Sequence, residues 1–267
     1  MGRYLMLDIG AGTMDMLCFD TDQDLHYKAV VRSPVRVLAD EIRRTRSNLV
    51  VTGVEMGGGP VSQALIERAK TNEVVMSTSA AATIHHNVEK VAAHGIRVVA
   101  ADEAEGLIEN SDFSPIRSGD LQIERIRRLV EGLGLPFAFD AVAICAQDHG
   151  VPPPGVSHLD FRHRMFTAVL EKEPTPYALL YRSDEVPAEM NRLTSISEDA
   201  RSLPADRIYV MDSGMAAILG ASKDTLATGM RRILVLDIAT SHTVGAALED
   251  GVLCGFFEYH TRDVTVA

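Results

Sequence analysis

The alternation of apolar and polar residues over the first thirty positions predicts three consecutive β-strands. Apolar or alternating runs cover residues 4–9, 14–19 and 25–31. A Gly-rich turn separates the first two runs and a polar turn at residues 20–24 separates the last two, so the turn residues agree with the strand periodicity. The chain is therefore expected to begin with a meander.

Helical and strand patterns alternate along the next part of the chain. Helices are predicted over residues 38–46, 60–70, 79–93 and 121–132, and strands over residues 48–52, 73–76, 96–100 and 141–145. Strands that alternate with helices favour a domain with a mainly parallel sheet. The expected fold class is therefore α/β.

Less regular stretches follow. Residues 147–154 are rich in Gly and Pro, and residues 183–204 are polar, which indicates a surface excursion or a small inserted helix pair. After them, the pattern predicts a strand over residues 207–211, a helix of small residues over 213–219 and β-structure over 231–259.

The most informative feature is an internal repeat. The sequence LMLDIGAGT at residues 5–13 is echoed by LVLDIATSH at residues 234–242, and in each case a second strand, a polar turn and a third strand follow. A repeated unit of strand, turn, strand, turn and strand predicts two lobes that begin alike.

The turn in the first copy has the chemistry of a phosphate site. The strand ends in Asp8 and continues into Gly10, Ala11, Gly12 and Thr13. Glycines allow the backbone to approach a phosphate, free amides and the Thr hydroxyl donate to it, and the carboxylate can hold Mg²⁺ beside it. Taken alone, one such turn is explained better by a hairpin that needs Gly only for its geometry. The echo, which also carries an Asp, favours a nucleotide clamped between two hairpins.

Three motifs resemble the superfamily that contains actin, the heat-shock 70 chaperones and the sugar kinases. DIGAGTMD at residues 8–15 looks like its first phosphate motif and ILVLDIATSHT at residues 233–243 like its second. Between them, VMDSGMAAILG at residues 210–220 resembles the acidic residue and crossing helix that link the two lobes.

This resemblance implies a ribonuclease-H-like, actin-type ATPase fold. The first lobe would comprise residues 1–222, including the crossing helix 213–220, and residues 223–267 would form a partial second lobe, a three-stranded meander.

The resemblance also implies ATP and Mg²⁺ as cofactors. Asp8 would hold Mg²⁺ through water and Asp212 would orient or deprotonate the nucleophile, so these two are the predicted catalytic residues. The predicted nucleotide contacts are Gly10, Ala11, Gly12, Thr13, Asp237, Thr240 and Ser241.

Two further stretches are candidates for binding a small-molecule substrate. AVAICAQDHG at residues 141–150 looks like the strand and Gln-x-His-Gly loop of carbohydrate kinases, where the loop faces the substrate, so Gln147 and His149 are predicted contacts. Gly57, Gly58 and Gly59 precede a helix whose free amides can hold an anion. Both stretches also have an explanation without a ligand. Gln147 and His149 can simply cap a strand end, and the three glycines can form a tight turn between a strand and a helix.

The chain departs from the superfamily pattern in its second half. The second turn carries Ala239, Thr240, Ser241 and His242 where glycines are usual, and about 25 residues follow His242, too few for an adenosine motif. Three explanations stay open: a fragment, a second lobe supplied by another chain or a second copy, or the loss of adenosine binding. We expect a minimal or truncated second lobe with weakened nucleotide affinity.

Charge and hydropathy exclude two classes of partner. The net charge of −11 repels nucleic acid in the absence of a basic patch. No apolar run reaches the length needed to span a bilayer, and the chain enters a strand pattern at once, so we expect a cytoplasmic protein without membrane contact.

Cysteines and histidines restrict the metal chemistry. The three cysteines are isolated in apolar segments and are expected to be buried, which excludes iron–sulfur and zinc-ribbon sites. The adjacent His85 and His86 point to different helix faces, so they do not form an i, i+4 metal pair.

Three further stretches resemble a prokaryotic family that carries the label pyruvate-formate-lyase-activating enzyme. They are Thr52-Gly53, MGGGP at residues 56–60 and the QDHG loop. The radical chemistry that this label implies requires a three-cysteine cluster, which this chain lacks.

Two functions follow from these features. The first is an ATP-dependent phosphotransferase acting on a small hydroxylated molecule, and the second is a nucleotide-sensing ATPase that acts on a protein partner. A degenerate, non-catalytic ligand-binding protein is the third alternative.

Overall fold

Three antiparallel strands open the fold, as the hydrophobic pattern predicts. In the computed structural model, which describes residues 2–153 and 155–263, β1 (Arg3–Ile9), β2 (Thr13–Asp20) and β3 (Leu25–Arg32) pair in chain order. Leu5, Leu7 and Ile9 alternate on one face of β1 and are almost fully buried. The predicted meander is confirmed.

The meander continues into a larger sheet. On the other side of β1 lies β8 (Ala141–Ala146) in parallel, followed by the parallel strand β10 (Ile208–Asp212) and the antiparallel edge strand β9 (Leu180–Arg182). The strand order is β3-β2-β1-β8-β10-β9. The helices that share the core cluster of this sheet are α6 (Ile123–Gly132), α7 (His158–Leu170), α8 (Asn191–Ala200) and α9 (Ser213–Ser222).

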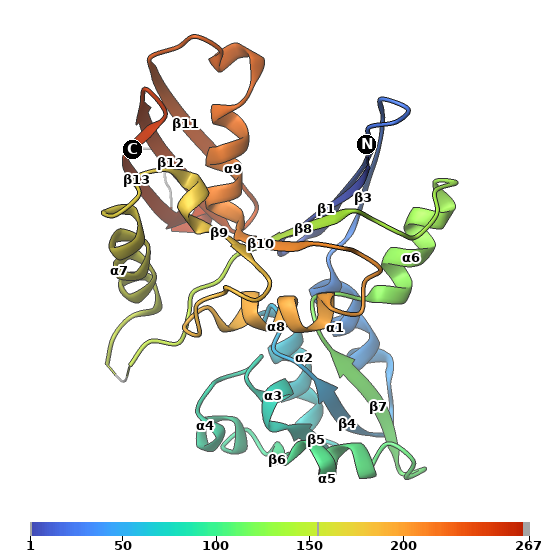
Figure 1. The fold of residues 1–267 in the computed structure, drawn as a ribbon. Helices are drawn as coiled ribbons and strands as arrows, with labels where there is room; N and C mark the ends of the chain where they lie inside the picture. Colours follow the sequence, from blue (N-terminus) through green and yellow to red (C-terminus); the bar gives the residue numbers. More distant parts are fainter. Residues whose placement is uncertain (1, 154, 264–267) are drawn as a thin grey trace.

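A second sheet is inserted between β3 and α6, at the bottom of Figure 1. It is fully parallel, in the order β6-β5-β4-β7. Its strands are β4 (Asn48–Gly53), β5 (Val74–Ser77), β6 (Arg97–Val99) and β7 (Phe113–Ser118). The helices of the insertion are α1 (Pro34–Arg44), α2 (Pro60–Ala69), α3 (Thr78–Ala81), α4 (Val88–Ala92) and α5 (Ala101–Gly106). The parallel strands therefore belong to two sheets with separate cores.

Some predicted elements differ from the structure for local reasons. The helix expected over residues 79–93 is divided into α3 and α4, because the side chain of Asn87 accepts bonds from the amides of Glu89 and Lys90 and starts a new helix. The strand β7 is not predicted, since it contains Pro115, which an edge strand tolerates. The polar stretch 183–204 contains one helix packed on the sheet, α8, instead of a surface excursion or a helix pair.

The internal repeat of the sequence is also a repeat of hydrogen-bond geometry. The amide of Gly10 donates to the carbonyl of Thr13 at 3.0 Å, and the amide of Ala239 donates to that of His242 at 3.1 Å. The residue after the third strand also donates to each turn, from Ser33 to Gly12 and from Thr261 to Ser241. The second copy is the antiparallel sheet of β11 (Arg232–Ile238), β12 (His242–Glu249) and β13 (Val252–His260), at the upper left of Figure 1.

The two copies differ in what surrounds them. Helix α9 packs against β11, but no described strand pairs with the outer edge of β11. The face of β11 that corresponds to the buried face of β1 is exposed. The exposed fractions are 0%, 2% and 1% for Leu5, Leu7 and Ile9, and 86%, 60% and 69% for Leu234, Leu236 and Ile238.

The three cysteines differ in their burial. Cys18 is buried as expected, but Cys254 lies exposed on β13, so the expectation that all three are buried is wrong. Among the described residues, none of the helices combines the length and the apolar character that crossing a membrane requires.

Equivalent leucines of the two repeats should respond differently to truncation. Leu5→Ala is expected to lower the free energy of unfolding by about 3 kcal/mol, because it leaves a cavity in the core. Leu234→Ala serves as the matched control and should change it by less than about 0.5 kcal/mol. Urea unfolding followed by circular dichroism measures both, and equal losses would contradict the exposed position of Leu234.

Candidate functional site

A cavity of ≈1530 Å³ lies where several segments of the chain converge. They include the β1–β2 turn, the β11–β12 turn, the β4–α2 turn, the segment between α3 and α4, the loop after β8 and the start of α9. The predicted site residues that line it are Asp8, Gly10, Ala11, Gly12, Thr13, Gly57, Gly58, Gly59, Gln147, His149, Asp237, Thr240 and Ser241. The fold thus brings together residues more than 200 positions apart, but Asp212 is not part of this lining.

The two repeated turns face one another across the cavity. A Cβ atom placed on Gly12 would lie only 3.9 Å from the methyl carbon of Thr240. Within residues 2–153 and 155–263, the backbone amides of Ala11, Gly12, Thr240 and Ser241 donate to no protein acceptor. The paired turns therefore present unsatisfied N–H groups from both copies, which is the arrangement that binds an anion.

Carboxylates gather beside the first turn. Asp8 is open to the cavity, and Cys145 donates a hydrogen bond to it at 3.3 Å. Removal of bulk water by the cavity walls raises the pKa of Asp8, the bond from Cys145 opposes this shift, and the charges of Asp15 and Asp237 add to it. A divalent cation bound among these carboxylates would relieve this mutual repulsion.

The donors fit a hydrated cation. Among the described residues, no three His, Cys, Asp or Glu side chains converge on one metal position. Mg²⁺ keeps several water ligands and needs only one or two carboxylates. The residues that could hold it are Asp8 and Asp237.

Asp212 lies behind the cavity in a buried ionic cluster. Both of its carboxylate oxygens accept bonds from the guanidinium of Arg162, at 2.6 and 2.8 Å, and one caps α9 through the amide of Gly214. Arg162 also pairs with Glu258 of β13 at 2.8 Å. The exposed fractions of the three side chains are between 1% and 3%.

The charges of this cluster stabilise one another. Burial alone would lower the pKa of Arg162, but the adjacent Asp212 and Glu258 carboxylates raise it. Gln147, a predicted substrate residue, donates to Glu258, so its side chain takes part in the same cluster. In this conformation Asp212 joins α9 to α7, and its role as a base stays a prediction.

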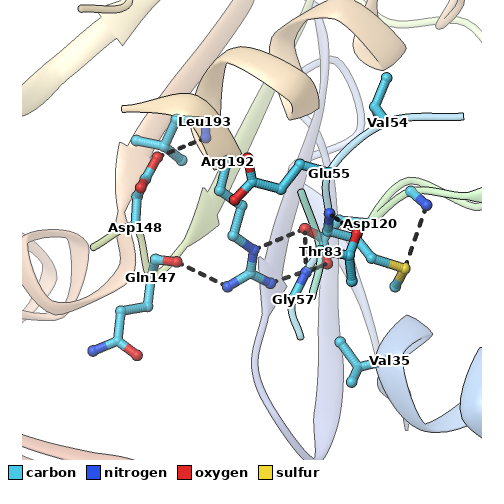
Figure 2. A network of polar contacts seen from close by, with 12 residues as sticks. Val35, Val54, Glu55, Gly57, Thr83, Asp120, Gln147, Asp148, Arg192 and Leu193 are labelled. Carbon is cyan, nitrogen blue, oxygen red and sulfur yellow. Dashed lines mark hydrogen bonds and ion pairs between the residues drawn. The ribbon is translucent and has the colours of Figure 1, made fainter. Parts of the chain in front are cut away.

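Three consecutive residues at the start of α8 organise the opposite wall of the cavity. Each of them binds a different carboxylate, and Figure 2 shows two of the three pairs. The pairs are Asn191 with Glu55 at 2.8 Å, Arg192 with Asp120 at 2.8 Å, and the amide of Leu193 with Asp148 at 2.9 Å. Helix α8 thereby connects the inserted sheet to the loop after β8.

The Gly-rich turn after β4 is shaped by this wall. The amide of Gly57 donates to both oxygens of Asp120, and a Cβ on Gly57 would lie 2.8 Å from Nη2 of Arg192 (Figure 2). A side chain at this position would therefore displace the guanidinium of Arg192 from its place beside Asp120. Gly59 has a φ of 49°, a conformation that favours glycine, where α2 begins.

Glu55 and His86 form a polar pair that the sequence did not reveal. The ring Nε2 of His86 lies 3.0 Å from the carboxylate of Glu55, and both residues line the cavity. The hydrogen bond to Glu55 raises the pKa of His86, while burial opposes this shift. The sequence showed only a His-His pair in an expected helix, because the partner lies 31 positions away.

Three histidines meet beside the second turn. The ring centroids of His149 and His242 are 5.4 Å apart, and those of His242 and His260 are 4.4 Å apart. Burial lowers the pKa of His242 to about 4, and the nearby His260 and Arg162 make smaller contributions in the same direction. The imidazole of His242 is therefore neutral near pH 7.

Comparison with known proteins gives one family. Residues 56–267 match the family described as "Putative pyruvate format-lyase activating enzyme (DUF1786)". This match confirms the resemblance to the family with that label. A search of curated proteins found no match.

Loss of the Asp212 charge should destabilise the fold. Asp212→Asn is expected to lower the free energy of unfolding by about 3 kcal/mol, because it weakens a buried ion pair and leaves Arg162 with less compensation. The exposed Asp206→Asn is the matched control. Urea unfolding gives the comparison, and wild-type stability of Asp212→Asn would contradict the structural role.

The low pKa of His242 should make stability depend on pH. Below about pH 6.5 the unfolded chain binds a proton at His242 that the folded chain does not bind until near pH 4, so stability falls as the pH is lowered through this range. His242→Gln should lose less stability than the wild type between pH 7.5 and 4.5, as measured by thermal unfolding. The exposed His94→Gln should parallel the wild type, and parallel curves for all three proteins would refute the shift.

Proposed function

The chain belongs to the family that residues 56–267 match, and we propose that it is an ATP-dependent phosphotransferase acting on a small hydroxylated molecule. One observation carries this proposal. Two turns of the same hydrogen-bond geometry, from the two copies of the repeat, bring unsatisfied amides to one cavity lined by Asp8 and Asp237.

The finer fold assignment is part of the proposal. The strand order β3-β2-β1-β8-β10, with β2 antiparallel to the others, supports a ribonuclease-H-like fold of the actin type. The start of a second copy at β11, the first strand after α9, supports the proposal that α9 is a crossing helix between two lobes.

The residues present fit a nucleotide phosphate. The amides of Ala11 and Gly12 would hold it from one side and those of Thr240 and Ser241 from the other. Side chains at the second turn narrow the approach, but the Thr240 and Ser241 hydroxyls add donors. Mg²⁺ bound near Asp8 would neutralise charge on the transferred phosphate.

The substrate is assigned to the wall opposite the phosphate turns. Gly57, Gly58 and Gly59 lie there beside the loop with Gln147 and His149. Asp212 can serve as the base only if its pair with Arg162 opens. We therefore assign it first to holding α9 and the loop after β8 in place.

An exposed apolar surface favours the second function, a nucleotide-sensing module that acts on a protein partner. Leu234, Leu236 and Ile238 present their side chains to solvent along an unpaired strand edge. Such a surface is typical of an interaction site, for a partner chain or a second copy.

We propose a cytoplasmic location for either function. The three cysteines are free thiols, as is usual in a reducing compartment.

Binding of Mg-ATP is the decisive test. Isothermal titration calorimetry should give a Kd below about 1 mM for the wild type. Asp8→Asn should weaken Mg-ATP binding about tenfold or more, because it removes the carboxylate that would hold the cation. Asp22→Asn, in the exposed turn after β2, is the matched control and should bind like the wild type. The absence of wild-type binding would contradict the proposed function.

A further inference from the structure

A carboxylate–imidazole pair stands on the cavity wall that the inserted sheet contributes. Glu55 follows β4, and His86 lies in the segment between α3 and α4. Nε2 of His86 is 3.1 and 3.0 Å from the two carboxylate oxygens of Glu55. The exposed fraction is 14% for the side chain of Glu55 and 27% for that of His86, so the pair is partly buried but accessible from the cavity.

A third residue fixes the orientation of this pair. The side-chain nitrogen Nδ2 of Asn191, at the start of α8, donates to the carboxylate of Glu55 at 2.8 Å. The next residue, Arg192, is held by Asp120 and by the carbonyl of Gln147. The carboxylate of Glu55 is therefore positioned by the same helix end that orders the rest of this wall.

Both neighbours of the His86 ring contact Nε2: the Glu55 carboxylate at 3.0 Å and the side-chain nitrogen of Asn191 at 2.5 Å. A carboxylate only accepts hydrogen bonds, so Glu55 favours the tautomer with the proton on Nε2. Nδ1 then carries the free lone pair, and no described residue is hydrogen-bonded to it. Because His86 lines the cavity, this lone pair is available to a molecule bound there.

Asp212, the other candidate for the proton-accepting base, has no access to the cavity. Asp212 is 1% exposed and its oxygens are occupied by Arg162 and backbone amides. A proton acceptor must come within hydrogen-bond reach of the hydroxyl that it deprotonates. His86 lines the cavity and is 27% exposed, so a bound hydroxyl can approach it without the opening of a buried ion pair.

We infer that His86, positioned by Glu55 and Asn191, is the base that accepts the proton of the substrate hydroxyl. The inference rests on the proposed phosphotransferase function and names a catalytic residue for it. The hydroxyl oxygen forms a bond to the terminal phosphorus while the bond from that phosphorus to the bridging oxygen of the nucleoside diphosphate breaks. The proton moves to Nδ1 of His86 and then to water.

The charges around His86 give the reaction a defined pH dependence. Glu55 and Asp148 face the ring, Lys90 and His85 interact beside it, and Arg192 is neutralised by Asp120. Only neutral His86 can accept a proton, so the rate should rise with pH through its pKa. Glu55→Gln removes the carboxylate charge, which strengthens the hydrogen bond to His86 and raises this pKa, so the rising limb should move to lower pH.

The test compares His86→Gln with the wild type. A glutamine retains an N–H donor for Glu55 but accepts no proton. ADP formation from Mg-ATP is measured with water alone and with a panel of polyols and sugars, and His86→Gln should reduce the fastest rate by about 10²-fold or more. Its Mg-ATP affinity by calorimetry should stay within about twofold. The exposed His94→Gln is the matched control and should retain the wild-type rate.

A second readout is independent of turnover. Nitrogen-15 NMR of the histidine rings, assigned by the signal lost in His86→Gln, should show a proton on Nε2 and a pKa that falls in Glu55→Gln. A His86 ring protonated on Nδ1 in its neutral form would overturn the inference whatever the rate.

The outcomes separate the inference from the proposed function. If the wild type forms ADP and His86→Gln retains its rate within about threefold, the role of His86 is refuted and the phosphotransferase stands. If the wild type binds no Mg-ATP or forms no ADP with any acceptor, both are refuted. Loss of rate with unchanged nucleotide affinity and the Nε2-protonated ring supports both.

Discussion

The buried guanidinium of Arg162 holds together three parts of the chain that are distant in sequence. It lies in α7 and contacts Asp212 at the start of α9 and Glu258 in β13. Burial of a cation is strongly unfavourable unless its charge is compensated, and two carboxylates compensate it here. The second meander is thereby attached to the carboxyl end of β10, and the two phosphate-type turns come to face each other across the cavity.

The repeat shows how one local pattern can exist in two environments. Both copies form the same turn, because the backbone hydrogen bonds that define it are made within the copy itself. Their apolar faces differ, since burial depends on neighbouring elements. Leu7 is covered beside β8, whereas the equivalent Leu236 is 60% exposed. The second meander offers a phosphate turn and an open surface at the same time.

The cavity wall at α8 has a different physical origin. A helix start has unpaired amides and favours negative charge, and three carboxylates from three segments meet there. Arg192 offsets part of their repulsion by pairing with Asp120. Polar groups that face a cavity from such a rigid frame are suited to orient a substrate. For this reason we assign the catalytic base to the Glu55–His86 pair.

The sequence by itself determined the meanders, the two matching turns and the glycines beside them, because periodicity and turn chemistry act over a few residues. It also named thirteen of the residues that line the cavity, which lie at strand ends and in the adjoining turns. Only the tertiary structure decided that Asp212 is enclosed by Arg162, that His86 meets Glu55 and Asn191, and that Leu234 stays exposed. Arg162 and Glu258 are separated by 96 positions, and charge pairing or burial at such separations depends on how the elements pack, which no local pattern records.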